Sequence, residues 1–411
     1  MVFLDMPISP ANWSIVTVLN PWVRNKSVAF SKRASFILMG AKRLLKAVYF
    51  PFFWRANIQT ETLKTIKVSK VFYIIHLKAL FLSKNAPMQA VSDYQKAFLT
   101  FLESQSFLKE PENLYAPISY IMGLGGKRLR PILALMGCDA YAAPIQKAMP
   151  VALAIEVFHN FSLVHDDIMD QAPLRRGFET VHEKWDLNTG ILSGDAMLIM
   201  AYQALEGYES PVFKSLTKMF SKTALEVCEG QQLDVDFETM ETVAEETYLK
   251  MIGLKTAVLV AGALKMGAMV AGAPQEEQDK MYSFGMLLGL AFQIQDDYLD
   301  AFGNPKNFGK TVGGDITNNK KTLMYIKALE LGTPAQQKSL KDLFSLQPQD
   351  PTHKIAEVKA LFDVTGAAKA MQDSIVSYTD NAFEVLNTMA ITEAKKQLLK
   401  DFGVQLMGRS S

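Results

Sequence analysis

The sequence predicts an all-α fold, a large helical bundle around a central cavity, and three observations lead to this prediction. From residue 90 onward apolar residues recur almost everywhere at helical spacing, with no convincing alternating β-run between them. Runs of small residues such as LVAGALKMGAMVAGA suit helices that pack closely in the middle of a bundle. Two carboxylate clusters of identical spacing each end an apolar helical segment, which indicates that both face one cavity.

Residues 1–87 differ from the rest of the chain in charge. They carry 13 Lys and Arg residues against two acids, whereas the remainder has 30 basic and 40 acidic residues. No run in them reaches the ~18 apolar residues of a spanning helix, and the start lacks the pattern of a signal peptide. Three interpretations stay open: translation that begins at Met88, a targeting or membrane-surface extension, or a helical arm. We favour the first, expect the catalytic domain at 88–411, and do not favour membrane contact.

The remaining composition indicates a globular protein. The 411 residues suffice for a sizeable core, and 49% of them are hydrophobic and 21% charged. The two cysteines, Cys138 and Cys228, lie in apolar helical patterns without metal-ligand spacing. We expect both to be buried free thiols in a reducing compartment, and hence a cytoplasmic protein.

The apolar periodicity predicts helices in order along the catalytic part. The first group comprises 91–108, 112–123, 131–142, 147–170, 178–208, 211–237, 244–272 and 276–301. A stretch rich in Gly, Pro and Asn, FGNPKNFGKTVGGD at 302–315, then predicts a loop. Helices are expected again over 320–332, 335–346, 353–391 and 392–408.

The first carboxylate cluster stands in FSLVHDDIMDQAPLRR. It places Asp166, Asp167 and Asp170 within five residues and is followed by Arg175 and Arg176. On a helix, positions i and i+4 share a face, so Asp166 and Asp170 point the same way and Asp167 about 100° away. Carboxylates this close repel one another unless cations accompany them. The pattern predicts a divalent-metal site beside two guanidinium groups.

The same spacing recurs in QIQDDYLD, which holds Asp296, Asp297 and Asp300. One carboxylate cluster on a helix is commonly only a solvated face. Two clusters of the same spacing, each at the end of an apolar segment, favour a shared metal site instead.

Several basic motifs accompany the two clusters. In GGKRLRP two glycines precede Lys127, Arg128 and Arg130, a flexible turn that can bring cations to a phosphate. Further basic groups are Arg175–Arg176, Lys255 with Thr256 in GLKTA, Lys310 in FGKTVGGD and Lys320–Lys321 in NNKKT. Carboxylates for metal together with so many cations predict a highly negative ligand, and two diphosphates suit the number of basic groups better than one.

Together these motifs resemble the trans-isoprenyl diphosphate synthases, the family of farnesyl, geranylgeranyl and longer polyprenyl diphosphate synthases. GGKRLRP, HDDIMD followed by RRG, GLKTA, FQIQDDYLD and GK…GGDI stand in that family's order over roughly residues 90–405. The resemblance implies an all-α bundle around a deep cavity, a homodimer and about three Mg²⁺ ions per active site. It implies head-to-tail condensation of isopentenyl diphosphate with an allylic diphosphate, and no nucleic-acid partner.

The resemblance also implies roles for individual residues. Isopentenyl diphosphate would be held by Lys127, Arg130, His159 and Arg176. The allylic diphosphate would be held by Arg175, Lys255, Thr256, Gln293, Lys310 and Lys320, with Lys321 as the alternative to Lys320. Asp166 and Asp170 would ligate two Mg²⁺ ions and Asp296 a third, with Asp167, Asp297 and Asp300 as supporting carboxylates. Asp234 in GQQLDVD resembles an acidic position lining the same cavity.

The expected chemistry explains these residue types. Breaking the allylic C–O bond leaves a carbocation and a diphosphate, whose charge Mg²⁺, Lys255 and the other cations stabilise. The isopentenyl double bond attacks the cation, and a proton is lost to the departing diphosphate. Water would quench the cation, so an apolar helical cavity is needed. We expect His165 and His182 to pack or orient neighbours rather than act as bases.

Product length is expected to depend on the turn before the first cluster. Phe161 and Ser162 lie five and four residues before Asp166, where a single Phe gives a partial floor to the tail pocket. The first motif also lacks a two-residue insertion between its aspartates. Both features resemble short-chain synthases that make fifteen- or twenty-carbon products.

Two alternatives are weighed against this hypothesis. A class I terpene cyclase shares the fold and one aspartate-rich motif, but it would typically lack both DDYLD and GGKRLRP, which this chain has. A catalytically silent subunit of a heteromeric synthase is disfavoured because both aspartate clusters are complete.

Overall fold

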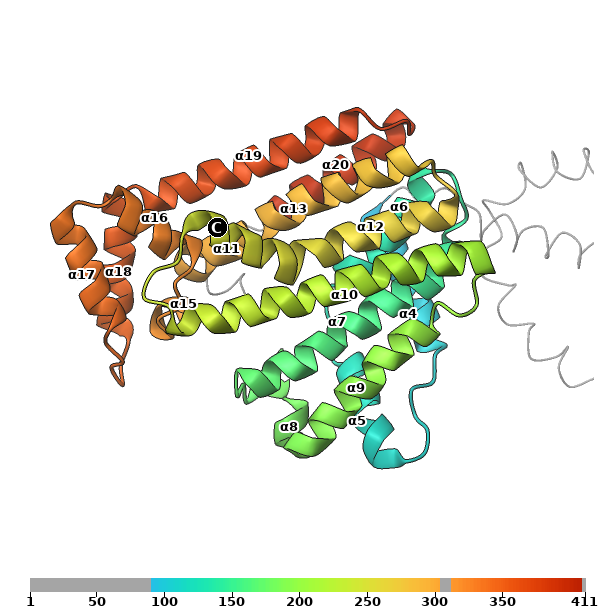
Figure 1. The fold of residues 1–411 in the computed structure, drawn as a ribbon, viewed down its shortest axis with the longest axis horizontal. Coiled ribbons are helices and arrows are strands. Elements are labelled where there is room, and N and C mark those ends of the chain that lie inside the picture. The colour runs from blue at the N-terminus through green and yellow to red at the C-terminus, as the bar shows by residue number, and fades with distance from the viewer. Residues whose placement is uncertain (1–89, 304–311, 409–411) are drawn as a thin grey trace, which may run out of the picture. The chain divides into compact units, whose positions relative to one another are not determined.

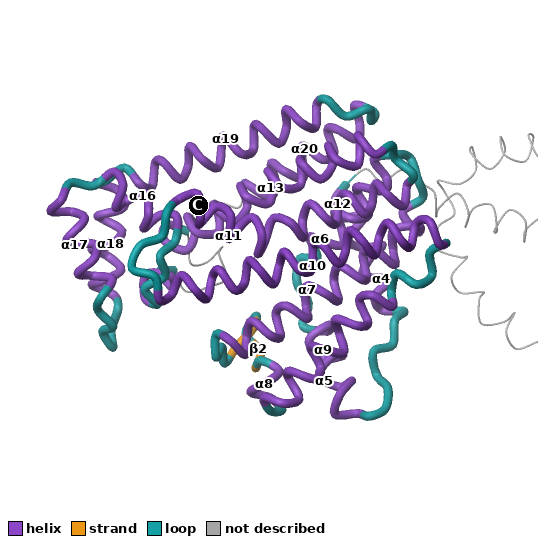
Figure 2. Tube along the Cα trace, viewed as in Figure 1, coloured by secondary structure: helices purple, strands orange, loops and turns teal. Residues whose placement is uncertain are grey.

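The computed structural model describes residues 90–303 and 312–408, which form a bundle of helices (Figure 1). The predicted all-α class is confirmed. The sheet in the described residues is one short antiparallel hairpin, in which Leu174 of β1 (Leu174–Arg175) pairs with Glu179 of β2 (Phe178–Glu179). Figure 2 shows how little of the chain this hairpin occupies.

The first half of the described chain runs from α4 to α10. They are α4 (Val91–Glu103), α5 (Glu112–Gly123), α6 (Leu129–Ala140), the 3₁₀ turn η2 (Ile145–Ala148), α7 (Met149–Met169), α8 (Val181–Lys184), α9 (Leu187–Gln203) and α10 (Ser210–Thr239). Helix α7 packs mainly on α9 and α6, so it runs through the middle of this half.

The second half begins with a continuous helical rod formed by α11 (Glu245–Ile252), the π turn η3 (Gly253–Ala257) and α12 (Val258–Ala271). The helices that follow the rod are α13 (Gln275–Phe302), α15 (Gly314–Thr317), α16 (Leu323–Leu331), α17 (Pro334–Phe344), α18 (Thr352–Val364), α19 (Ala367–Asn387) and α20 (Glu393–Met407). Helix α13 packs along both α12 and α19. These packing partners bury α13 on several sides, as the small residues of this region predict.

The closest helix crossing joins α6 and α12, at two glycines. A Cβ atom on Gly137 would lie 2.3 Å from the carbonyl oxygen of Leu264, and one on Gly267 would lie 2.1 Å from that of Ala134. No real Cβ atom fits at such distances, so each glycine lets one backbone touch the other. The expectation of closely packed helices is confirmed at this crossing.

Three predicted helices are wrong in their extent. The helix expected over 91–108 ends at Glu103, and residues 104–110 are not helical. The segment 353–391 is two helices, because Gly366 between α18 and α19 adopts φ +82°, which glycine tolerates without a Cβ penalty. The segment 178–208 starts as strand β2 and is interrupted before α9, whose N-terminal backbone is capped by Asp186 accepting a hydrogen bond from the Thr189 amide.

Two long apolar stretches are core helices. Ile145–Met169 and Glu245–Ala271 have the length and hydropathy of membrane spans, but 67% and 61% of their most apolar windows are buried by other parts of the protein.

The two cysteines differ in burial. Cys138 is buried, and burial raises its pKa to about 12. Cys228 is exposed, so the expectation that both thiols are buried is wrong for it: its side chain lies on an outer face of α10.

Candidate active site

A cavity of about 1110 Å³ lies among the C-terminal ends of α7, α10 and α13, the turn η3 and the residues around α15. Its charged lining is mixed. The acidic members are Asp166, Asp170, Asp234, Glu238, Asp296, Asp297, Asp300 and Asp315, and the basic ones are Arg175, Lys255, Lys320 and Lys321. The structure therefore brings both aspartate clusters to one cavity together with several of the expected cations.

Helix α7 ends at the first cluster and turns two of its aspartates into the cavity. Asp166 and Asp170 line the cavity, and the Asp170 amide donates to the carbonyl of Asp166 at 2.8 Å. Burial, and then the nearby charge of Asp170, raise the pKa of Asp166 to about 6, while Lys255 opposes this shift. Two close carboxylates in a partly buried site favour a bound cation.

Asp167 lies behind the other two, as the 100° rotation along the helix predicts. It is 1% exposed and accepts three hydrogen bonds from Arg175, two from Nε at 2.8 and 2.7 Å and one from Nη2 at 2.6 Å. This pairing fixes the hairpin residue Arg175 at the edge of the cavity. It also speaks against the supporting metal role expected of Asp167, because its oxygens face the guanidinium.

The second cluster ends α13, and two of its carboxylates bind neighbouring protein groups. Asp297 accepts from the Tyr248 hydroxyl at 2.7 Å and from Gln293 Nε2 at 3.0 Å, and Asp300 accepts from the Asp315 amide at 3.0 Å. Burial, and then the charge of Asp315, raise the pKa of Asp297 to about 8. Sequence reasoning gave no role to Tyr248 or Asp315. Asp315 belongs to the motif GGDI, whereas an isolated tyrosine such as Tyr248 carries no sequence signal.

The π turn η3 carries Lys255 and Thr256 into the cavity. Thr256 Oγ1 donates to Gln293 Oε1 at 3.1 Å, and Lys255 Nζ donates to Asp234 Oδ2 at 2.6 Å. Gly230 makes this possible, because a Cβ atom there would lie 2.2 Å from the backbone nitrogen of Lys255. Helix α10 thus touches the π turn and sets Asp234, one turn after Gly230, beside the lysine. Such single π turns are frequent at functional sites.

Neighbouring groups distinguish the two lysines of NNKKT. Lys321 Nζ donates to the carbonyls of Phe237 and Glu238, at 3.3 and 3.2 Å, and so binds the last turn of α10. These bonds join α10 to the segment after α15, which lie beside each other in Figure 1. Burial disfavours the charge of Lys320, but Asp234 and Asp315 raise its pKa above the ordinary value. Lys320 is therefore the better candidate for a diphosphate. Lys310 lies outside the described residues.

A second cationic cluster forms around the loop that precedes α6. Arg176 donates to the carbonyl of Gly125, and Arg130 Nη1 lies 3.1 Å from His159 Nε2. Burial, and then Arg130 and Arg176, hold the pKa of His159 well below its ordinary value, so the imidazole is neutral at pH 7. Lys127 belongs to the same loop, and its carbonyl accepts from Gln95 Nε2 at 3.3 Å. The residues expected to hold isopentenyl diphosphate are thus gathered apart from the cavity lining.

The two residues expected to limit product length lie beside the cavity rather than in its lining. Phe161 is 9% exposed and packs against Phe158 and His165, with ring centroids 5.4 and 4.8 Å away. The Ser162 hydroxyl donates to the carbonyl of His159 at 2.9 Å. Leu163, the next residue, lines the cavity. The contact of His165 with Phe161 agrees with a packing role for this histidine.

The carboxylates fit Mg²⁺ without forming a complete protein cage. Within 90–303 and 312–408, no three His, Cys, Asp or Glu side chains form a ready-made metal site. Mg²⁺ usually takes one or two carboxylates and completes its coordination with water and substrate phosphates. The pair Asp166–Asp170, with Asp296 lining the same cavity, has the oxygen donors that this mode of binding needs.

Comparison with known proteins gives consistent matches. The family model for polyprenyl synthetase matches residues 111–363. The chain is 37% identical to a geranylgeranyl diphosphate synthase of Methanosarcina mazei over 71% of this chain and 88% of that one. It is 33% identical to a geranylfarnesyl diphosphate synthase of Natronomonas pharaonis over 78% and 97% of the two chains. A crystal structure of a geranylgeranyl pyrophosphate synthase, 52% identical, superposes with a TM-score of 0.76 over 79% of this chain and 100% of that one.

Proposed function

The chain belongs to the polyprenyl synthetase family and is a prenyltransferase that makes short-chain prenyl diphosphates, and we propose that it does so in the cavity between α7, α10 and α13. One observation carries the proposal: two aspartate clusters and the cations Lys255 and Lys320 line the same cavity. The comparisons give no support to a terpene cyclase or to a catalytically silent subunit.

The two substrates are assigned to the two groups of cations. The allylic diphosphate lies in the cavity, against Arg175, Lys255, Thr256, Gln293 and Lys320. Isopentenyl diphosphate lies at the loop before α6, against Lys127, Arg130, His159 and Arg176. The neutral His159 donates or accepts a hydrogen bond there without adding a further positive charge to the arginines.

We assign about three Mg²⁺ ions to the allylic site, with Asp166, Asp170 and Asp296 as their protein ligands. When bound, Mg²⁺ supplies Lewis-acid stabilisation of the charge that develops on the departing diphosphate. Asp297 and Asp300 act instead by holding Gln293 and Asp315 in place, and Asp167 by holding Arg175.

The protein's own groups then account for the rest of the reaction. The allylic C1–O bond breaks, its electron pair leaves with the diphosphate, and Lys255 and Lys320 offset the added charge. The isopentenyl C4 forms a bond to the allylic C1, and the proton lost from C2 passes to the diphosphate. Apolar groups such as Leu163, Met251 and Ile252 in the cavity wall exclude water from the carbocation.

We assign the twenty-carbon geranylgeranyl diphosphate as the product. The names of several relatives support this choice, including the Methanosarcina mazei protein and the structure that is 52% identical. The sequence predicts fifteen or twenty carbons, so the fifteen-carbon product is one competing outcome. The other is the twenty-five-carbon product in the name of the Natronomonas pharaonis relative.

A homodimer is proposed because α9 exposes an apolar face. Leu187, Ile191, Leu192 and Ile199 are 40 to 59% exposed on this one helix. Several exposed apolar side chains on one helix are typical of a protein interface. Sedimentation of the wild-type protein and of the variant Leu192→Glu/Ile199→Glu tests it: the former should sediment as a dimer and the latter as a monomer.

A cytoplasmic location is proposed on the cysteines. Cys138 is buried and Cys228 is exposed, and both are free thiols. Free thiols persist in reducing compartments. A fluorescent fusion found outside the cytoplasm would contradict this assignment.

The deciding experiment is incubation with isopentenyl diphosphate and each of the five-, ten- and fifteen-carbon allylic diphosphates, with products sized by chromatography. The wild-type protein should extend at least one primer to twenty carbons when Mg²⁺ is present and none when it is chelated. Asp166→Ala should abolish turnover while the circular dichroism spectrum stays that of a folded helical protein. Substantial turnover by the folded Asp166→Ala variant would reject the metal-site assignment.

A further inference from the structure

Arg128 of GGKRLRP turns into the protein interior. It is 5% exposed, and its guanidinium donates from Nη1 to Glu156 Oε1 and from Nη2 to the carbonyl of Met122 at 2.5 Å. Glu156 is itself 2% exposed and also accepts from Asn160 Nδ2 at 3.0 Å. A buried carboxylate on α7 thus binds the loop before α6 from within.

The backbone at Arg128 needs such a contact. Its φ of 51° and ψ of 38° lie in the left-handed region, where residues other than glycine are disfavoured. Two glycines with positive φ, Gly125 and Gly126, precede it. A flexible loop that ends in a strained residue keeps one conformation only when its surroundings stabilise it.

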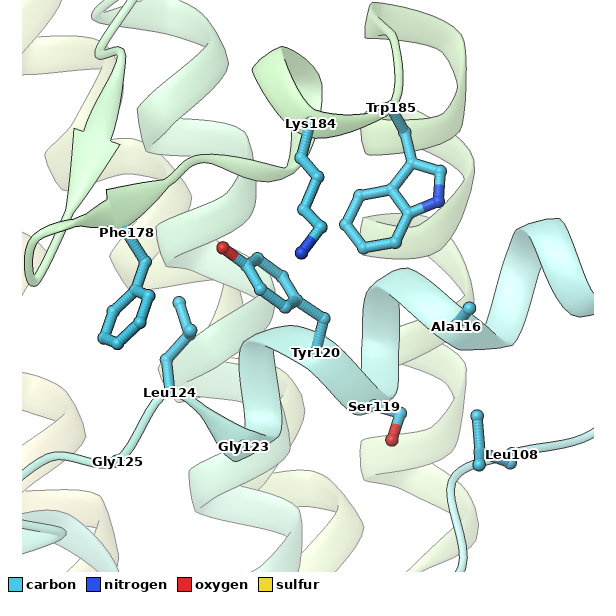
Figure 3. Close-up of a pocket in the computed structure, with 10 residues that line it drawn as sticks. All are labelled: Leu108, Ala116, Ser119, Tyr120, Gly123, Leu124, Gly125, Phe178, Lys184 and Trp185. Atoms are coloured by element: carbon cyan, nitrogen blue, oxygen red, sulfur yellow. The ribbon is translucent and has the colours of Figure 1, made fainter.

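One side of the loop is open. Leu124 and Gly125 border a second, open pocket of about 630 Å³ (Figure 3). The side chains of Tyr120, Phe178 and Trp185 also line this pocket (Figure 3). Arg176 and Gln95 bind the loop carbonyls of Gly125 and Lys127. The bonds to the strained residue itself lie on the inner side, where Arg128 meets Glu156.

The same stretch of α7 serves both diphosphate sites. Glu156 and His159 are one turn apart, and His159 contacts Arg130, two residues after Arg128. Further along the helix α7 ends in the metal-site aspartates. Because Lys127 and Arg130 flank Arg128, a rotation of Arg128 would displace both side chains relative to the allylic site.

We propose that Glu156 is a positioning residue for the isopentenyl diphosphate half of the site and that it acts through Arg128, a proposal that rests on the function assigned above. The carboxylate holds the left-handed turn at Arg128, and this turn aims Lys127 and Arg130 at the substrate. Glu156 touches neither substrate. Its loss should weaken the binding of isopentenyl diphosphate and leave the allylic diphosphate unaffected.

The test is a double-mutant cycle of Glu156→Gln, Arg128→Met and the double variant, with KM measured separately for the two substrates. Each single variant should raise the KM for isopentenyl diphosphate at least tenfold, and change the allylic KM and kcat less than threefold. The double variant should be no worse than the worse single one, because both residues act through one contact.

Asp139→Asn provides the matched control. Asp139 is a partly buried carboxylate at the C-terminal end of α6, the end away from the loop, and it accepts from Lys395 Nζ at 2.5 Å and from the Tyr94 hydroxyl. This variant should lower the thermal midpoint without changing either KM. If a single variant does not fold, the double variant, which leaves no unpaired buried charge, still reports on the isopentenyl KM.

Two outcomes would overturn the proposal. Unchanged isopentenyl KM in folded variants would show that the pair is structural only, and additive effects would show that Glu156 does not act through Arg128. Failure of the assigned function looks different, because the wild-type protein would then turn over no combination of the two substrates.

Discussion

His159 lies where a charged imidazole is unfavourable. Arg130 Nη1 is 3.1 Å from its Nε2, and burial and this arginine hold its pKa well below the ordinary value. In the unfolded chain the same histidine takes up a proton near pH 6.5. The stability that His159 contributes is therefore fully present above about pH 6.5 and is lost as the pH falls through that value toward its folded pKa.

This predicts a difference between the wild-type protein and His159→Asn, which cannot take up the proton. Below about pH 6.5 the wild-type free energy of unfolding should fall with decreasing pH more steeply, by up to about 1.4 kcal/mol per pH unit. Urea denaturation of both proteins from pH 8 to pH 5, without substrates or metal, measures the two slopes. Parallel pH profiles would show that His159 titrates normally in the folded protein.

Phe161 carries the prediction on product length. Phe161→Ala removes a ring that packs against Phe158 and His165, two residues before Leu163 of the cavity wall. The space it leaves should let the prenyl tail grow, so the product distribution should shift to longer chains by at least one isoprene unit. Chromatographic sizing checks this, and an unchanged distribution would remove Phe161 from the account of chain length.

The control for Phe161→Ala must match its cost, since deleting a buried Phe ring costs about 3–5 kcal/mol. Phe402 is 2% exposed in the same apolar core, but it lies on α20, which does not pack on α7. Phe402→Ala should lose comparable stability and keep the wild-type product. Both variants should be assayed below their thermal midpoints.

At the scale of single residues, the sequence predicts which side chains face the cavity better than it predicts which side chains bind one another. The spacing of Asp166, Asp167 and Asp170 indicates which two share a face, because the period of the helix alone decides it. The bond from Arg175 to Asp167 depends on the path of the hairpin between them, which no local pattern contains. Glu156 does have a sequence signal, because it is a lone acid inside the apolar run AIEVF.

At the scale of elements, two glycines allow equally close approaches with different consequences. A Cβ atom on Gly230 would lie 2.2 Å from the Lys255 nitrogen in the π turn, and one on Gly267 would lie 2.1 Å from the Ala134 carbonyl oxygen in α6. Both substitutions by Ala force a backbone shift, which typically costs about 1–3 kcal/mol. Only the first shift moves residues of the cavity.

We therefore expect Gly230→Ala to lose both stability and activity, with a KM for the allylic diphosphate at least tenfold higher, because Lys255 and Thr256 are displaced. Gly267→Ala should lose similar stability and keep its KM values. Gly207→Ala, where a Cβ atom meets nothing within 4 Å, should change neither. Thermal melts and steady-state kinetics on the three variants check this. A raised allylic KM in Gly267→Ala would show that the effect is a general consequence of destabilisation.

Helix existence was predictable from apolar periodicity, whereas helix interruptions were not. The break at Gly366 lies within a continuing apolar pattern, and a single Gly does not by itself end a helix. The π turn at Gly253–Ala257 leaves the rod helical on both sides, so the sequence shows only an unbroken segment over 244–272. Such a turn follows from tertiary contacts with α10, which local sequence does not encode.

At the scale of the whole molecule, the described residues contain both apolar cores and both proposed substrate sites. The members of the two cores run from Val91 to Met407. The geranylgeranyl pyrophosphate synthase structure is matched over 100% of its length by 79% of this chain. The class of the fold was predictable because apolar residues recur at the helical period along the long segments. The residues 1–87 lie outside the described part, so the favoured interpretation of them stays a prediction.

That interpretation makes 88–411 a complete catalytic domain, and it predicts that a protein beginning at Met88 is fully active. Deleting 1–87 removes none of the core or site residues named above. We therefore expect kcat and both KM values to stay within about twofold of those of the full chain. A twofold change corresponds to less free energy than the roughly 1 kcal/mol that the loss of one hydrogen bond costs. Kinetics on the two proteins at equal protein concentration measure this. Asp166→Ala in the shortened protein should be inactive, which excludes a contaminating synthase. A shortened protein that folds but does not turn over would mean that the extension takes part in catalysis, and the domain boundary would then have to move toward the N-terminus.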